Sequence, residues 1–167
     1  YPLIYFAVPE NPSPLSERAI ARLNAYLRSG GALVIDTRDG DTAGNTEISR
    51  LESLLEGLDA PPLQPVPANH VLMRTFYLLQ DFPGRYAGRQ LWIERAGSGS
   101  APRGDGVSGL FIGDADWISA WAVDEKGRDL YSVDGGAEQR EVARRFGVNL
   151  VMYILTGSYK DDQVHLP

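Results

Sequence analysis

The stretch SERAIARLNAYLRSGGALVID, residues 16–36, decides the fold class of this chain. Its first part carries apolar residues at a spacing of three and four, which predicts an amphipathic helix over residues 16–29 with Ser16 as its N-cap. The pair Gly30–Gly31 ends this helix. The wholly apolar run that follows, residues 32–35, is typical of a strand covered on both faces, as in a parallel sheet.

A second apolar run lies before this stretch and completes a strand–helix–strand unit. Residues 1–8 read YPLIYFAV and predict a strand. Strand, helix, glycine stop and strand in this order form a βαβ unit, in which the two strands run parallel. Later patterns predict four more elements: helices over 46–56 and 137–155, and strands over 90–94 and 107–112. The whole chain, residues 1–167, is therefore predicted to be a single three-layer α/β domain with a mostly parallel sheet.

Three further segments have distinctive compositions. The proline-rich residues 61–67 predict a loop, and residues 70–79 predict a turn with a short extended piece. The second half of the last predicted helix, residues 148–155, is apolar nearly all round, which predicts that this half is buried. Within it, Asn149 is expected to bond to a neighbouring backbone group, because buried polar groups are hydrogen-bonded.

Composition excludes several classes of function. Hydrophobic residues make up 43 % of the chain and charged residues 23 %, as in an ordinary globular protein. The net charge of −6 argues against a nucleic-acid partner and against docking on anionic lipid, because both need a basic surface. The chain has no cysteine, which excludes disulfides, thiolate metal sites and a cysteine nucleophile. No run approaches the roughly 20 apolar residues of a membrane span, so this segment is not expected to insert into lipid.

Acidic residues follow two of the predicted strands. Asp36, Asp39 and Asp41 leave the second strand, and Asp114 and Asp116 come directly after the strand at 107–112. Ligands of such sheets bind outside the carboxyl ends of the strands. If the two strands are neighbours, five carboxylates converge on one crevice, and such oxygen ligands suit Mg²⁺ or Ca²⁺. The alternative is local chemistry, in which these residues close turns, cap helices or pair with arginines.

One histidine and two tryptophans are further candidates for a site. His70 could move protons if a carboxylate from an acidic loop oriented it, and it could equally be a loop residue whose ring bonds to the backbone. Trp117 and Trp121 are four residues apart and share one face of a helical turn. They could line a pocket or a partner surface, where tryptophan is enriched, or they could belong to the core.

Four long strings follow one another along the chain: LSERAIARLNAYLRSGGALVIDTRD, NHVLMRTFYLLQDFPGR, DADWISAWAVDEKGRDLYSV and GGAEQREVARRFGVNLVMYILTGSYKDDQVHLP. With them the chain resembles, over essentially its full length, the bacterial domain of unknown function 4159. The resemblance implies membership of the class I glutamine-amidotransferase-like group and a flavodoxin-like, doubly wound sheet. It implies a further strand and helix before residue 1, so that the first strand–helix unit of the fold is absent from this chain. It also implies a soluble domain of a bacterial inner-membrane protein.

These observations give two main hypotheses for the function. Glutamine amidotransferases use a cysteine on a sharp strand-to-helix turn, and the cysteine-free chain is therefore not expected to have that activity. The first hypothesis is a non-catalytic module of a membrane-anchored envelope protein, without a cofactor, that binds an envelope protein or a small ligand. Its binding face would include Asp36, Asp39, Asp41, Trp117 and Trp121.

The alternative hypothesis is a hydrolase that works in the acidic crevice with a divalent cation. Asp36, Asp39 and Asp114 would hold the cation. The candidates for the catalytic groups are His70, Asp114 and Asp116. A third hypothesis is the binding of a sugar or nucleotide without chemistry, which an exposed Trp117 at a pocket mouth would support.

Overall fold

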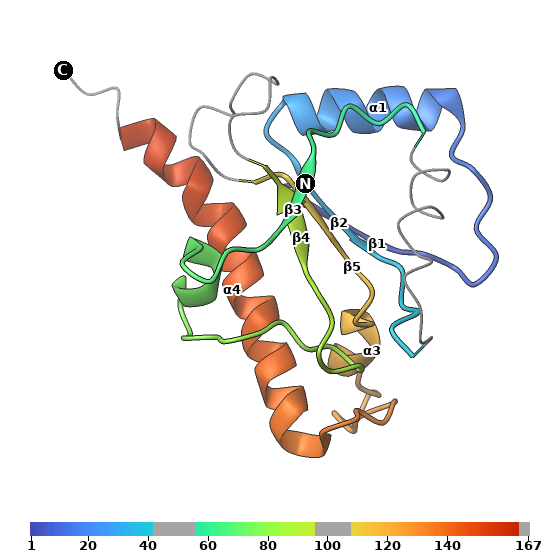
Figure 1. Ribbon diagram of the computed structural model, residues 1–167, viewed down its shortest axis with the longest axis vertical. Helices are drawn as coiled ribbons and strands as arrows, with labels where there is room; N and C mark the ends of the chain where they lie inside the picture. Colours follow the sequence, from blue (N-terminus) through green and yellow to red (C-terminus); the bar gives the residue numbers. More distant parts are fainter. Residues whose placement is uncertain (42–55, 96–107, 164–167) are drawn as a thin grey trace.

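The computed structural model describes residues 1–41, 56–95 and 108–163, and the side chains of its last helix as far as residue 156. The predicted helix over 46–56 lies almost wholly outside these residues. In the described part, five strands form one open sheet and three α-helices cover it (Figure 1). None of these helices is both long enough and apolar enough to cross a membrane.

The predicted βαβ unit is confirmed. It consists of β1 (Leu3–Ala7), α1 (Glu17–Arg28) and β2 (Ala32–Asp36), and β1 pairs parallel with β2. Ser16 caps α1 as expected, because its side chain accepts a hydrogen bond from the backbone N–H of Ala19 at 3.2 Å. Gly30 follows the helix at φ 91°, a conformation that glycine adopts without steric cost.

The strand order of the sheet is β1-β2-β5-β4-β3. β5 (Leu110–Gly113) runs parallel to β2, whereas β4 (Trp92–Glu94) runs antiparallel to both β5 and β3 (Leu63–Pro65). Four of the five strands therefore point the same way. The prediction of a loop over residues 61–67 was wrong, because this segment contains β3. Proline lacks a backbone N–H, and β3 tolerates it because it lies at the edge of the sheet.

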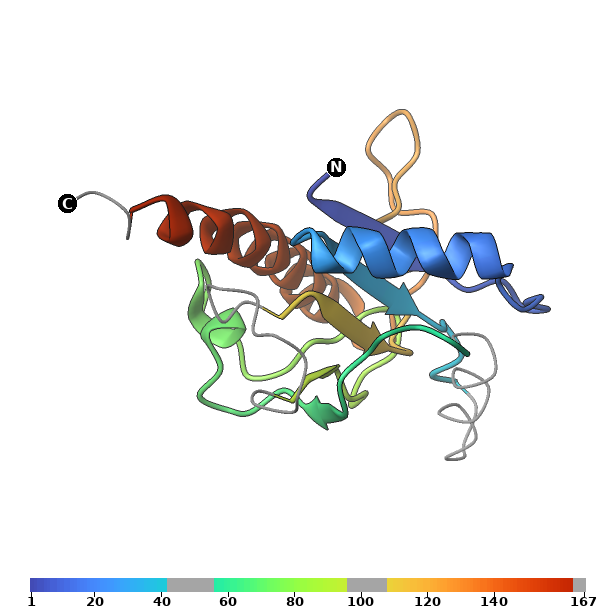
Figure 2. The same cartoon turned by 90° about the horizontal axis from the view of Figure 1, so that it is seen from above.

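Helices cover both faces of the sheet and give three layers (Figure 2). α1 packs its Leu27 against Leu33 and Ile35 on one face. On the other face, Val34 and Phe111 pack against α4 (Gly136–Gln163) and the short helix α3 (Trp117–Trp121). Alternate residues of β2 thus point to opposite helical layers, which explains why the whole strand is apolar until its last residue.

The helix α4 differs from its prediction in length and burial. It extends to Gln163 rather than ending near residue 155. The prediction that residues 148–155 are buried all round was wrong, since Val148, Val151 and Leu155 are 41 %, 44 % and 48 % exposed. The helix lies across one face of the sheet, and only its inward side is covered by that contact.

The prediction for Asn149 is confirmed. Its side chain is fully buried and forms four hydrogen bonds with the segment that follows the 3₁₀ helix η1 (Val71–Arg74) and with η1 itself. The side-chain oxygen accepts from the N–H groups of Phe76 and Tyr77, and the amide donates to the carbonyls of Leu72 and Tyr77. Residues 70–79 were predicted to form a turn with a short extended piece, but residues 71–74 form a 3₁₀ helix. The hydrogen bonds of Asn149 connect this segment to α4.

Candidate functional site

The carboxyl ends of β2 and β5 lie side by side, since Asp36 is in register with Gly113. Three segments meet there, residues 36–41, 84–90 and 113–117, and we name this region the junction. The N–H of Gly40 donates to the carbonyl of Asp114 at 3.0 Å. A Cβ atom at Gly40 would lie 2.6 Å from that same oxygen, so this close approach requires glycine.

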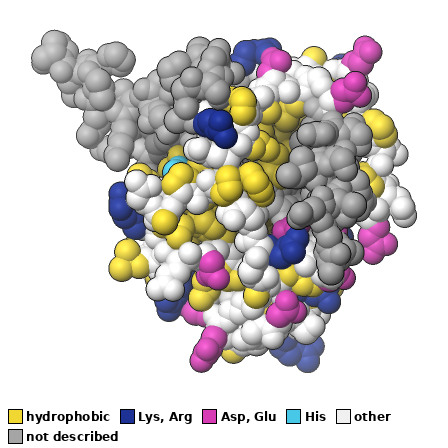
Figure 3. Space-filling model, viewed as in Figure 1, with side chains coloured by type: hydrophobic (Ala, Val, Ile, Leu, Met, Phe, Trp, Pro, Cys, Tyr) yellow, Lys and Arg dark blue, Asp and Glu magenta, His cyan; other side chains and the backbone are white. Residues whose placement is uncertain are grey.

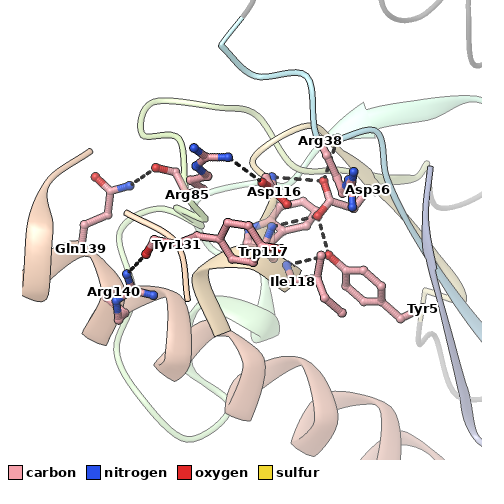
Figure 4. A network of polar contacts seen from close by, with 10 residues as sticks. All are labelled: Tyr5, Asp36, Arg38, Arg85, Asp116, Trp117, Ile118, Tyr131, Gln139 and Arg140. Atoms are coloured by element: carbon pink, nitrogen blue, oxygen red, sulfur yellow. Dashed lines mark hydrogen bonds and ion pairs between the residues drawn. The ribbon is translucent and has the colours of Figure 1, made fainter. Parts of the chain in front are cut away.

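Asp36 is the centre of the junction and is completely buried (Figure 4). One of its carboxylate oxygens accepts hydrogen bonds from the Tyr5 hydroxyl at 2.5 Å and from the Trp117 N–H at 2.8 Å. The other oxygen accepts from the backbone N–H groups of Arg38 and Asp116, each at 3.2 Å. The four donors occupy the acceptor sites that a carboxylate offers. Asp36 therefore holds the loops after β2 and β5 together and has no acceptor site left for a ligand.

Burial sets the protonation behaviour of this centre. Desolvation raises the pKa of Asp36 to about 6, and the hydrogen bonds from Tyr5 and Trp117 limit that rise. Burial, together with the neighbouring Asp36 carboxylate, raises the pKa of the Tyr5 hydroxyl, which stays a neutral donor. Asp36 thus carries its charge at pH 7 at a cost in folding free energy.

Asp36 is expected to stabilise the protein more in mild acid than at neutral pH. In the unfolded chain the Asp36 carboxyl has its usual pKa of 3.8. Between pH 3.8 and about 6, Asp36 is therefore mostly protonated in the folded protein and mostly ionised in the unfolded chain. The contribution is complete below the lower value and is lost as the pH rises through the upper one. Between pH 7.5 and 4.5 it amounts to about 2 kcal/mol.

Urea unfolding of the wild type and of Asp36→Asn at these two pH values measures this contribution. Other carboxylates titrate in both proteins, so the difference between the two proteins isolates Asp36. That difference should move by about 2 kcal/mol in favour of the wild type at the lower pH. An equal difference at both pH values contradicts the raised pKa.

Arg38 and Asp116 are unusual members of the junction. They are the two described non-glycine residues with positive φ, at 61° and 57°, and the left-handed region costs an ordinary residue about 1 kcal/mol. Among the described residues, the Arg38 Nε and the Asp116 Oδ1 are buried without a hydrogen-bond partner. Asp116 is only 4 % exposed, and its Oδ2 lies 3.8 Å from a guanidinium nitrogen of Arg85.

The remaining acidic candidates do not join Asp36 and Asp116. Asp114 is held by Arg89, whose Nε donates to Oδ2 at 2.9 Å, and Asp39 accepts from the Thr37 hydroxyl at 2.5 Å. Asp41 is exposed to solvent. In the described ranges, no three of the histidine, aspartate and glutamate side chains lie close enough together to hold a metal ion. The predicted convergence of five carboxylates was wrong. Asp114 binds an arginine, Asp39 binds a threonine and Asp36 binds backbone N–H groups, so these side chains do not gather around one point.

His70 lies at the other end of the sheet from the acidic residues. Its Nδ1 accepts from the N–H of Leu72 at 3.2 Å and caps η1. Its ring is 5.4 Å from that of Tyr153, whose hydroxyl accepts from the N–H of Ser108, just before β5 begins. Burial lowers the pKa of His70. Because Asp114 follows the opposite end of β5, the predicted crevice that combines His70 with the acidic loops does not form.

The two tryptophans belong to the core. Trp117 is 1 % exposed, packs against Phe146 and donates from Nε1 to the carbonyl of Phe82 at 2.8 Å. Trp121 is partly buried and donates from Nε1 to the carbonyl of Ala143 at 2.7 Å. The expectation that Trp117 lies on a binding face or at a pocket mouth was therefore wrong. Their polar neighbours Asp116 and Ser119 are also buried.

The functional candidates that the sequence reasoning missed are the arginines. Arg38 lies between two aspartates in the string DTRD directly after a strand, and Arg85 follows a glycine that contacts the loop after β5. Arg38 could have been identified from the sequence, because it is a positively charged residue within an acidic loop. No pattern near Arg85 indicates that it reaches Asp116, because the two are 31 positions apart in the sequence.

Comparison with known proteins gives a family and no activity. A family model described as Domain of unknown function (DUF4159) matches residues 1–155. No curated protein matches the chain. The family match covers all the residues of the junction.

Proposed function

Because the chain belongs to the family of the domain of unknown function 4159, whose description names no activity, we propose its function from its own residues. It is a non-catalytic α/β module that binds a small polar ligand at the junction. Its place in a membrane-anchored envelope protein of bacteria, and its flavodoxin-like or amidotransferase-like kinship, are parts of this proposal that rest on the family resemblance.

One observation carries the proposal. Arg38 and Asp116 are both held in the left-handed region, and each leaves a buried polar atom without a partner among the described residues. Buried polar groups in proteins are nearly always hydrogen-bonded, and the exceptions call for an explanation such as a bound molecule. Backbone strain of this kind gathers at ligand sites and active sites. The position at the carboxyl ends of parallel strands is where such sheets bind ligands.

The arrangement favours binding over catalysis. The hydrolase hypothesis needs a histidine beside the acidic loops, and His70 lies beyond the other end of β5. Asp36 already accepts four hydrogen bonds and Asp114 is paired with Arg89, so neither is poised to activate a water molecule. Trp117 is buried and Trp121 is partly buried, so neither supports a protein-binding face at the junction.

The charge of the surface supports a small ligand rather than a polyanion. On the face shown in Figure 3, Lys and Arg side chains are scattered among Asp and Glu instead of forming one basic area. A nucleic-acid site needs several basic side chains along a stripe or patch. This view agrees with the net charge of −6 for the whole chain.

A fragment screen by ¹H–¹⁵N correlation spectra tests the proposal. Small polar compounds should shift the amide signals of Arg38, Arg85 and Asp116, and leave those of the tight turn around Gly127 unchanged. Arg38→Met removes the free donor and should abolish these shifts while the rest of the spectrum stays that of the folded protein. A screen whose hits all fall outside the junction, or that gives no hits, contradicts the proposed function.

A further inference from the structure

We propose that the ligand of the junction carries an uncharged hydrogen-bond donor and acceptor side by side, as a primary amide does. This inference rests on the proposed function and adds the chemical class of the ligand. It is carried by the two buried polar atoms, the Arg38 Nε and the Asp116 Oδ1, which lack partners among the described residues.

The two atoms make opposite demands on a ligand. The guanidinium Nε–H of Arg38 only donates, so it needs an acceptor such as a carbonyl oxygen. A carboxylate oxygen accepts hydrogen bonds, so the Oδ1 of Asp116 needs an N–H or O–H group. A carboxylate or phosphate ligand satisfies Arg38 and leaves Asp116 facing a like charge. An ammonium ligand satisfies Asp116 and leaves the donor of Arg38 facing another donor. A group with both functions satisfies both atoms.

Arg38 and Asp116 are neighbours around the same carboxylate. Their backbone N–H groups donate to the same Oδ1 atom of Asp36, each at 3.2 Å. Figure 4 shows Asp116 between Arg85 on one side and Asp36 with Arg38 on the other. Since Asp36 is fully engaged by four donors, it fixes the positions of its two neighbours without competing for the ligand.

The charge of the junction disfavours an anion. Its three segments contain five aspartates and three arginines. Arg89 is paired with Asp114, and Arg85 lies beside Asp116, so two of the three guanidinium groups already have carboxylate neighbours. A buried unpaired carboxylate oxygen facing an anionic ligand costs several kcal/mol, which corresponds to more than tenfold in affinity. An uncharged donor–acceptor group avoids this repulsion.

Matched pairs of probes test the ligand class. Acetamide against acetate, and benzamide against benzoate, keep the shape of the probe and change only its charge and its donor. Titrations followed by the amide signals of the junction should show binding of each amide at least about tenfold tighter than that of its carboxylate. In Asp116→Asn the new side-chain amide donates to a carboxylate, so the preference for the amide should fall by a similar factor.

Asp59→Asn is the matched control. It makes the same change of charge at an exposed residue that pairs with Arg28 at the end of α1, and it should leave the preference unchanged. A carboxylate that binds the junction as tightly as its amide overturns the ligand class and leaves the proposed function standing. If neither member of a pair binds while other fragments do, the ligand class again fails alone. If nothing binds the junction, both the ligand class and the proposed function fail, and a buried water molecule satisfies the two polar atoms.

Discussion

Replacing Asp36 by alanine is expected to lower the free energy of unfolding by about 5 kcal/mol, the largest effect of any single change in the junction. The substitution leaves four donors without their acceptor: the Tyr5 hydroxyl and the N–H groups of Arg38, Asp116 and Trp117. Each unsatisfied buried donor costs roughly 1–3 kcal/mol, reduced where a water can enter. A domain of this size has a total stability of about 5–15 kcal/mol, so the variant should lose between about a third and all of its stability.

Urea unfolding followed by circular dichroism measures this loss. Asp41→Ala is the control, because Asp41 is exposed and its removal should change the stability by about 0.5 kcal/mol or less. If Asp36→Ala unfolds at the same urea concentration as the wild type, Asp36 does not hold the loops after β2 and β5 together.

The second large effect is expected at Trp117. Trp117→Ala should lower the free energy of unfolding by about 4 kcal/mol, because it removes a fully buried indole from its packing against Phe146 and leaves a cavity. Trp117→Phe separates packing from hydrogen bonding, since it keeps an aromatic ring and loses the bond to the Phe82 carbonyl. This conservative variant should lose about 1–2 kcal/mol.

Denaturant unfolding of both Trp117 variants gives these values. The order of stability should be wild type, then the phenylalanine variant, then the alanine variant. A loss below about 1 kcal/mol for Trp117→Ala is the result for a surface residue, and it would return Trp117 to the candidates for a binding face.

The sequence was sufficient for the parts of the fold that depend on local pattern. The spacing of apolar residues in α1, its N-cap Ser16 and the apolar run of β2 predict the βαβ unit, because each acts over a few residues. The strand β3 was missed because its single proline, Pro65, and the prolines on either side of it indicate a loop. The place of β3 at the sheet edge makes Pro65 tolerable. The exposure of Val148 on α4 was missed because periodicity shows which residues are apolar and does not show what covers them.

The candidate site was predictable in position and not in chemistry. The rule that ligands bind at the carboxyl ends of parallel strands pointed to the loops that begin with Asp36 and Asp114. Which carboxylates are free depends on partners that are distant in the sequence. Arg89 binds Asp114, which is 25 positions away in the sequence. Asp116 lies near Arg38 because the backbone N–H groups of both residues bond to Asp36. Long-range contacts of this kind leave no local signature.

We propose that Arg38 is held in an unfavourable conformation because it binds a ligand, and not because folding requires it. The free energy of unfolding of Arg38→Gly tests this claim most directly, and it needs no knowledge of the ligand. Glycine adopts a φ of 61° without steric cost, keeps the N–H that donates to Asp36 and removes the buried Nε that lacks a partner among the described residues.

Arg38→Gly is expected to be more stable than the wild type by about 1 kcal/mol, after the larger entropy of glycine in the unfolded chain is allowed for. Urea unfolding of the two proteins at pH 7.5 gives the difference. A variant that is less stable than the wild type by a similar amount would show that the Arg38 side chain contributes to folding, and would contradict the assignment of the junction as a ligand site.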